Sequence, residues 1–202
     1  MASDILIAFV SFAAVTLFTP GPNNMMLMTS GLNFGFRRTL PHLLGVALGF
    51  SLMVLLVGVG IGAALTSYPR VYAAMQWGGV AYLLYLAWAI ATSGPPTRDG
   101  EGRGQPMTFL GAAAFQWINP KGWVMAVGAV TTFASLAAFP LNIATMCAVF
   151  GVLGLASSGV WVLFGQALRR LLSNPRTVRI FNVAMALALV ATLWPIAASL
   201  WP

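Results

Sequence analysis

The chain has 202 residues, of which 59% are hydrophobic and only 6% carry a charged side chain. A soluble domain has about 25% charged residues, so this composition excludes a soluble globule and indicates a membrane protein with several spans. The net charge of +7 does not indicate a nucleic-acid-binding protein. The basic residues lie in short loops between apolar runs, where they are typical of topology signals.

The first apolar run, about Ile5–Met28, is long enough for a transmembrane helix, which needs about 20 apolar residues. The run is interrupted at Pro20–Pro22, and proline both removes a backbone donor and clashes with the preceding turn. In hydrocarbon, a freed carbonyl costs several kcal/mol unless protein or water satisfies it. We therefore predict a broken helix that faces a protein-lined cavity. Asp4 stands where a signal peptide would be positively charged, so we expect this span to be retained.

Further apolar runs predict five more helical spans. The link after the first span, Thr29–Thr39, is polar and is expected to lie outside the helices. The longest polar stretch lies between Thr92 and Gln105, and its glycines and prolines mark a linker. The five predicted spans are about Leu40–Leu65, Val71–Ala91, Met107–Leu136, Leu141–Leu168 and Ile180–Leu200.

A second break interrupts the fourth span at Gln116–Trp123, where proline and glycine occur beside Lys121, the only lysine of the chain. Broken helices at corresponding positions of two halves indicate the binding site of a transporter. We therefore predict an all-α integral membrane protein in which six helices form two inverted three-helix repeats. As a single domain it has repeat 1 at about 1–92, a cytoplasmic linker at about 93–106 and repeat 2 at about 107–202.

Charge separates the two sides of the predicted membrane. Eight of the ten basic residues follow spans one, three and five or precede span six, whereas Arg70 is alone on the other side. The positive-inside rule therefore places those loops in the cytoplasm and both termini outside. The eight residues are Arg37, Arg38, Arg98, Arg103, Arg169, Arg170, Arg176 and Arg179.

The motifs at the two breaks resemble those of the LysE/RhtB family of amino-acid exporters. Thr19-Pro20-Gly21-Pro22, the Gly45-x-x-x-Gly49 pair and Asn119-Pro120-Lys121 carry the resemblance, together with the length and the span pattern. The resemblance implies a multi-pass exporter of amino acids or related metabolites in the bacterial cytoplasmic membrane, driven by the proton-motive force. It also implies a small-molecule substrate and contact with the lipid bilayer, while a homo-oligomer stays open. Many members have an acid directly after the glycine pair, where this chain has Phe50.

The polar residues of the two breaks are the candidate substrate-binding or gating residues. An intramembrane charge is expensive and is by default a functional candidate, so Lys121 either attracts a substrate carboxylate or donates to the freed carbonyls. The amides can bind an ammonium and a carboxylate, or can satisfy the breaks. His42 can titrate near neutral pH or be a solvated histidine at the membrane interface. The candidates are Pro20, Gly21, Pro22, Asn23, Asn24, Gln116, Asn119, Pro120 and Lys121.

The absence of acids from the predicted spans favours neutral substrates, because a basic amino acid or a metal cation would gain from a buried carboxylate. We expect no cofactor, no metal site, no nucleic-acid partner and no enzymatic activity. The alternatives are an integral-membrane enzyme, for which Ser157 and Ser158 lack a nearby base, and a channel or accessory membrane subunit without amino-acid export.

Overall fold

The computed structural model describes residues 2–60, 67–92, 105–171 and 174–194. Within these residues every regular element is a helix. The order is α1 (Ala2–Phe18), α2 (Pro22–Gly58), α4 (Pro69–Ala91), α5 (Phe109–Phe115), the short 3₁₀ helix η1 (Gln116–Ile118), α6 (Pro120–Thr132), the 3₁₀ helix η2 (Ala134–Leu136), α7 (Leu141–Leu171) and α8 (Pro175–Ala191).

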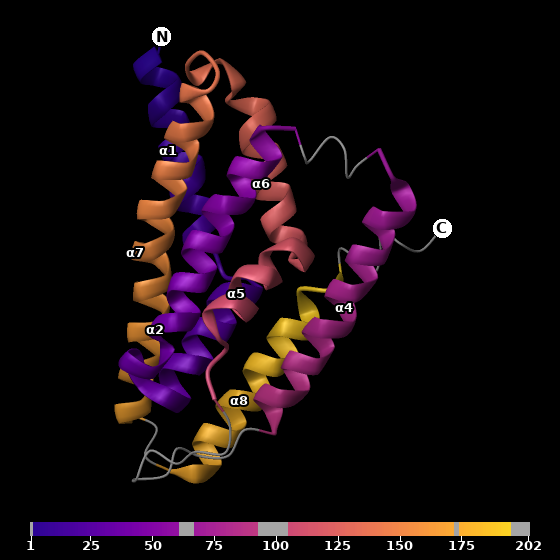
Figure 1. Cartoon of the computed structure of the whole chain (residues 1–202). Coiled ribbons are helices and arrows are strands. Elements are labelled where there is room, and N and C mark those ends of the chain that lie inside the picture. The colour runs from indigo at the N-terminus through magenta and orange to yellow at the C-terminus, as the bar shows by residue number, and fades with distance from the viewer. Residues whose placement is uncertain (1, 61–66, 93–104, 172–173, 195–202) are drawn as a thin grey trace.

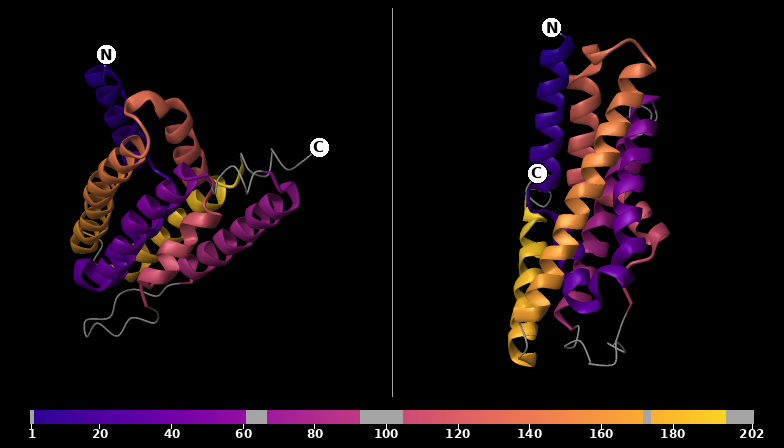
Figure 2. Two further views of the ribbon diagram at one scale, coloured as in Figure 1. Left: turned by 45° about the horizontal axis from the view of Figure 1, so that its top comes forward. Right: turned by 90° about the vertical axis from the view of Figure 1, so that its left-hand side faces the viewer.

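The helices form an elongated bundle with the two breaks near its middle (Figure 1). The two longest helices, α2 and α7, lie side by side, and α4 packs along α8 as a second pair (Figure 2). The short helix α5 lies against α2, between the two pairs. The reversal within α2, the end of α7 and the start of α8 meet at one end of the bundle. These segments contain six of the eight residues that predict the cytoplasmic side: Arg37, Arg38, Arg169, Arg170, Arg176 and Arg179.

Both predicted breaks are confirmed. The first separates α1, which ends at Phe18, from α2, which begins at Pro22. The second separates η1, which ends at Ile118, from α6, which begins at Pro120. Proline suits the first position of a helix because the N–H that it lacks would have no partner within the helix there.

The expected polar link at Thr29–Thr39 is wrong, because these residues are helical on both sides of Gly35. Gly35 has φ 77° and ψ 172°, a conformation that is accessible to glycine and strained for other residues. The chain reverses there: the hydroxyls of Ser30 and Thr39 are 3.4 Å apart, whereas nine residues of straight helix would span about 13 Å. Helix α2 therefore consists of a first arm, residues 22–34, and a second arm, residues 36–58.

The predicted start of the last span is also wrong. Helix α8 starts at Pro175 rather than Ile180, so Arg176 and Arg179, expected in a loop, are helical. The reason is local: the Asn174 side chain accepts a hydrogen bond from the Arg176 N–H at 2.9 Å and caps the helix, and Pro175 occupies its first position. The predicted end of this span lies outside the described residues.

Two helices are long and apolar enough to cross a membrane, α2 and α7 up to Arg169, in the part of the chain that the structure describes. Shorter apolar helices cover Ser3–Phe18, Trp77–Ala91 and Phe109–Ile118. The outer surface is apolar as well, which suits contact with lipid better than contact with water. Side chains that are more than half exposed include Leu110, Val124, Val152, Leu163 and Phe164.

Glycines let the helices approach closely around the second break. A Cβ on Gly45 would overlap the Phe109 carbonyl oxygen at the start of α5, and one on Gly49 would lie 2.8 Å from the Ala113 Cβ. Real Cβ atoms almost never lie within 3.0 Å of a heavy atom of another residue. Helix α5 therefore contacts the second arm of α2 at these two glycines. The glycine pair of the sequence motif therefore has a packing role.

Candidate functional site

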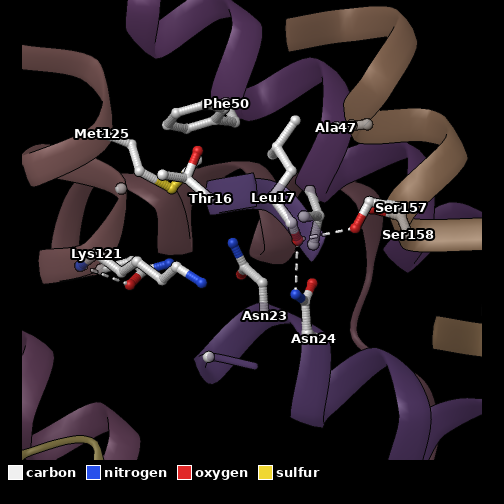
Figure 3. Close-up of a pocket in the computed structure, with 15 residues that line it drawn as sticks. Thr16, Leu17, Asn23, Asn24, Ala47, Phe50, Lys121, Met125, Ser157 and Ser158 are labelled. Carbon is white, nitrogen blue, oxygen red and sulfur yellow. Dashed lines mark hydrogen bonds between the residues drawn. The ribbon is translucent and has the colours of Figure 1, made fainter. Parts of the chain in front are cut away.

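The carbonyls that the first break frees from helical bonding are bonded from elsewhere. The Leu17 carbonyl accepts from the Asn24 side chain and from the Ser157 hydroxyl, each at 2.8 Å, as Figure 3 shows. The Thr19 carbonyl accepts from Asn24 at 2.9 Å and from the Lys121 ammonium at 2.8 Å. Lys121 also reaches the Pro20 carbonyl at 3.4 Å. The break therefore exists at low cost because α2, α6 and α7 supply donors to it.

The Lys121 side chain connects the two breaks: its backbone lies at the second break and its ammonium reaches the first. Its backbone lies in the first turn of α6, and its stem runs across Gly21, where an added Cβ would lie 2.8 Å from Cδ and 3.0 Å from Nζ. Gly21 is extended, with φ −173°, so its conformation does not require glycine. A side chain at this position would have to displace the Lys121 stem.

The amide side chains of Asn23 and Gln116 join the two breaks directly. The Asn23 Nδ2 donates to Gln116 Oε1 at 2.8 Å, and Gln116 Nε2 donates back to Asn23 Oδ1 at 3.3 Å. Gln116 also donates to the Ala112 carbonyl at 2.8 Å and has no exposed surface. A reciprocal amide pair fixes the distance between α2 and η1 without burying a charge.

This pairing predicts a measurable coupling. We expect Asn23→Ala to lower the free energy of unfolding by about 1–2 kcal/mol and Gln116→Ala by about 2–3 kcal/mol, because each leaves an amide without its partner. The double variant should lose about 1 kcal/mol less than the sum. Unfolding of the purified protein with a denaturing detergent measures these values.

A matched control is Thr145→Ala, which removes an exposed hydroxyl that donates only to the Leu141 carbonyl of its own helix. It should show no coupling to Asn23→Ala. If the losses at Asn23 and Gln116 added in full, the two side chains would not act as a pair.

At the second break, neighbouring residues of the same segment supply the hydrogen bonds. The Asn119 side chain is 2% exposed and accepts from the Lys121 N–H at 3.2 Å, so Asn119 caps α6 and Pro120 occupies its first position. The Trp123 indole donates to the Trp117 carbonyl at 2.8 Å. Trp117 and Trp123 thus stabilise the break and do not line the cavity described next.

The breaks enclose one side of a small cavity of about 40 Å³, which we call the break cavity. A single water needs about 10–15 Å³ by the same measure, so this conformation has room for a few waters. Lys121 is the one charged side chain among its described lining residues. The lining is Thr16, Leu17, Gly21, Asn23, Asn24, Val46, Ala47, Phe50, Asn119, Lys121, Gly122, Met125, Gly154, Ser157 and Ser158 (Figure 3).

The structure brings most of the predicted site residues to this cavity. Five of the nine candidates line it: Gly21, Asn23, Asn24, Asn119 and Lys121. The other four have backbone or bracing positions beside it: Pro20 and Pro22 bound the first break, Gln116 pairs with Asn23, and Pro120 starts α6. Their role toward a substrate stays a prediction.

Sequence reasoning missed the contribution of α7. Ser157 and Ser158 line the cavity, and the Ser157 hydroxyl donates to the end of α1, so it braces a helix end. The available signal was the spacing of Gly151, Gly154 and Ser157, which puts small residues on one side of a helix.

Phe50 forms an apolar wall of the break cavity at the position where many members of the resembled family have an acid. Its ring packs edge-on against Phe150 at 5.1 Å between centroids, and Phe150 meets Phe9 in the same way at 5.3 Å. The position thus belongs to an aromatic core between α1, α2 and α7.

Comparison with known proteins identifies the family. The model of the LysE type translocator family matches residues 14–194. The chain belongs to this family. This confirms the resemblance carried by the motifs at the two breaks.

Curated relatives cover almost the whole chain. It is 33% identical over 195 residues to the cysteine/O-acetylserine efflux proteins of Escherichia coli (strain K12) and Shigella sonnei (strain Ss046). It is 32% identical to the protein of that name from Escherichia coli O139:H28 (strain E24377A / ETEC). Each alignment covers 94% of this chain and 96% of the relative. No solved structure matches the chain. Membership of a translocator family identifies a membrane transporter rather than an enzyme.

Proposed function

We propose that this LysE-family translocator is a secondary transporter that exports small neutral amino acids or their O-acyl derivatives from the bacterial cytoplasm. The observation that carries the proposal is the meeting of two broken helices at one cavity with uncharged amide and hydroxyl groups. Such groups can hold the ammonium and carboxylate of an amino acid without a buried counter-charge. The curated relatives are named for the efflux of cysteine and O-acetylserine, and both molecules are small amino acids without a net charge, which supports the proposal.

The preference for neutral substrates follows from charge. Lys121 would repel a lysine or arginine side chain and would attract a carboxylate, and the described lining holds no carboxylate to compensate a second positive charge. Phe50 and Met125 add apolar surface that suits a short uncharged side chain. The small volume of the break cavity implies that the helices must move apart for an amino acid to enter.

The helix order supports two inverted repeats. Each half has a broken helix, then a long helix, then a helix of the outer pair, namely α4 in the first half and α8 in the second. The first broken helix runs down the bundle in Figure 1 and the second runs up it. With the basic end in the cytoplasm, the positive-inside rule predicts both termini outside, and the inverted-repeat arrangement predicts a break cavity near the midplane. The proton-motive force is the proposed driving force.

Counterflow in proteoliposomes tests the proposal. Vesicles loaded with unlabelled O-acetyl-L-serine should accumulate labelled O-acetyl-L-serine or L-cysteine, and uptake should saturate. Vesicles that contain the Asn23→Ala variant should show weaker counterflow, and loaded vesicles without the protein should show none. A protonophore should abolish net export against a gradient and leave counterflow intact, because exchange needs no energy input.

Two outcomes would overturn parts of the proposal. Saturable counterflow of labelled lysine as fast as that of O-acetyl-L-serine would contradict the neutral preference. Flux that rises linearly with concentration and is not accelerated by solute on the other side would indicate a channel.

A further inference from the structure

A second and much larger cavity lies toward the basic end of the bundle. It occupies about 450 Å³ between the two arms of α2, the end of α4 and the residues before α5. Thr92 and Gln105 are exposed and line its rim, whereas Thr29, Asn33 and His42 lie in its interior. We call it the basic-end cavity. It is more than ten times as large as the break cavity by the same measure.

The interior of the basic-end cavity contains polar atoms without a hydrogen-bond partner among the described residues. They are the Thr29 hydroxyl, the Asn33 Oδ1 and both ring nitrogens of His42. The side chains are 4%, 8% and 2% exposed, so bulk water does not reach them freely. His42 is therefore buried, and the expectation of a solvated interfacial histidine is wrong. An unsatisfied buried polar atom costs about 1–3 kcal/mol, and native proteins keep few of them.

These atoms define the chemistry of an occupant. A threonine hydroxyl donates and accepts, an asparagine carbonyl accepts, and a neutral imidazole offers one donor and one acceptor. The described lining contains no Asp, Glu, Lys or Arg, so a net charge on the occupant would find no counter-charge. Tyr85 and Trp88 add aromatic surface beside the polar groups. A small zwitterion with no net charge fits this combination.

The basic-end cavity and the break cavity lie along the same arm of α2. Asn23, Met26, Thr29 and Asn33 follow one another at intervals of three or four residues and share one side of the arm. From Asn23 to Thr29 the helix rises about 9 Å. Met26 is 4% exposed, lines the basic-end cavity and packs in one apolar cluster with Phe115, the residue before Gln116. Met26 thus lies between Asn23 of the break cavity and Thr29 of the basic-end cavity along this side of the arm.

We infer that the basic-end cavity, with Thr29, Asn33 and His42 as its polar groups, is a second binding site that takes the zwitterionic solute from the cytoplasm before it passes Met26. The inference rests on the proposed function. It adds a loading site that none of the predicted site residues lines.

Protection of a single cysteine from labelling tests the site without relying on transport. Ser30 lines the basic-end cavity and is 5% exposed. In a Cys147→Ala background, which removes the chain's only cysteine, Ser30→Cys should react with a small polar thiol reagent. O-acetyl-L-serine should slow that reaction about tenfold at a concentration near ten times its dissociation constant. Lysine at the same concentration should not.

The matched control is Arg37→Cys in the same background. Arg37 is exposed at the same end of the bundle but does not line the basic-end cavity, so its labelling rate should not depend on solute. Equal labelling of Ser30→Cys with and without saturating O-acetyl-L-serine would overturn the inference. That result would mean that the basic-end cavity holds only water or lipid.

Counterflow of two further variants provides the second readout. Thr29→Val keeps the shape and loses the hydroxyl, and His42→Gln keeps a neutral donor and acceptor. Thr29→Val should raise the half-saturating concentration about five- to tenfold, the loss of about one hydrogen bond, with little change in maximal rate. His42→Gln should change it less than His42→Leu does.

The outcomes separate the two proposals. Wild-type counterflow with an unchanged half-saturating concentration in Thr29→Val and His42→Leu would overturn the loading site and uphold the transporter. Absence of counterflow for every amino acid in folded wild-type protein would overturn both.

Discussion

Replacing Lys121 by methionine is expected to reduce amino-acid counterflow to the level seen in vesicles without the protein. Methionine retains an apolar stem against Gly21 but removes the ammonium that donates to the Thr19 and Pro20 carbonyls. A hydrogen bond from a charged donor contributes about 1.5–3 kcal/mol, so the free energy of unfolding should fall by about 2 kcal/mol. Counterflow in proteoliposomes and unfolding of the purified variant measure the two effects.

Lys121→Gln separates the two roles that the sequence leaves open for this side chain. Glutamine can still donate to a break carbonyl but carries no charge. If the ammonium attracts the substrate carboxylate, Lys121→Gln should recover much of the stability and little of the transport. Recovery of both would mean that Lys121 serves the helix break alone and would contradict a role in substrate binding.

The largest loss of stability is expected from Gly165→Ala. Helices α2 and α7 touch backbone to backbone here. A Cβ on Gly165 would overlap the Met28 carbonyl oxygen, and a Cβ on Gly31 would overlap that of Val162. The atoms in the way belong to the backbone, so a side-chain rotation cannot make room, and the two helices must separate. Overpacking typically costs about 1–3 kcal/mol, and we expect Gly165→Ala near the upper end, with a clear fall in melting temperature.

Gly159→Ala is the matched control for this prediction. It lies in the same helix, and a Cβ added at Gly159 would meet no other atom within 4 Å. Alanine favours a helix over glycine by about 0.5–1 kcal/mol, so this variant should be as stable as the wild type or slightly more stable. Equal melting temperatures for the two variants would contradict the close contact at Gly165.

Features that depend on a few neighbouring residues, such as helix breaks, could be predicted from the sequence. Proline cannot continue a helix from the residues before it, so both breaks were predicted correctly from Pro20–Pro22 and Asn119–Pro120. The same kind of rule explains two errors. Gly35 reverses the chain within one residue, so the polar link around it did not need to leave the helical state. Asn174 and Pro175 start α8 earlier than its apolar run suggests.

A membrane protein of the LysE type, with two broken helices and a strong charge asymmetry, could be predicted from the residues alone, because composition, proline positions and loop charges are properties of short segments. The partner of each freed carbonyl became visible only in the packed helices, because the donors are distant in the sequence. Lys121 bonds a carbonyl that lies 102 residues earlier, and Asn23 pairs with an amide 93 residues later. The burial of His42 at a polar cavity likewise depends on how the helices pack. A break in a helix creates unsatisfied groups locally, but the partners that satisfy them come from whichever helices pack against it.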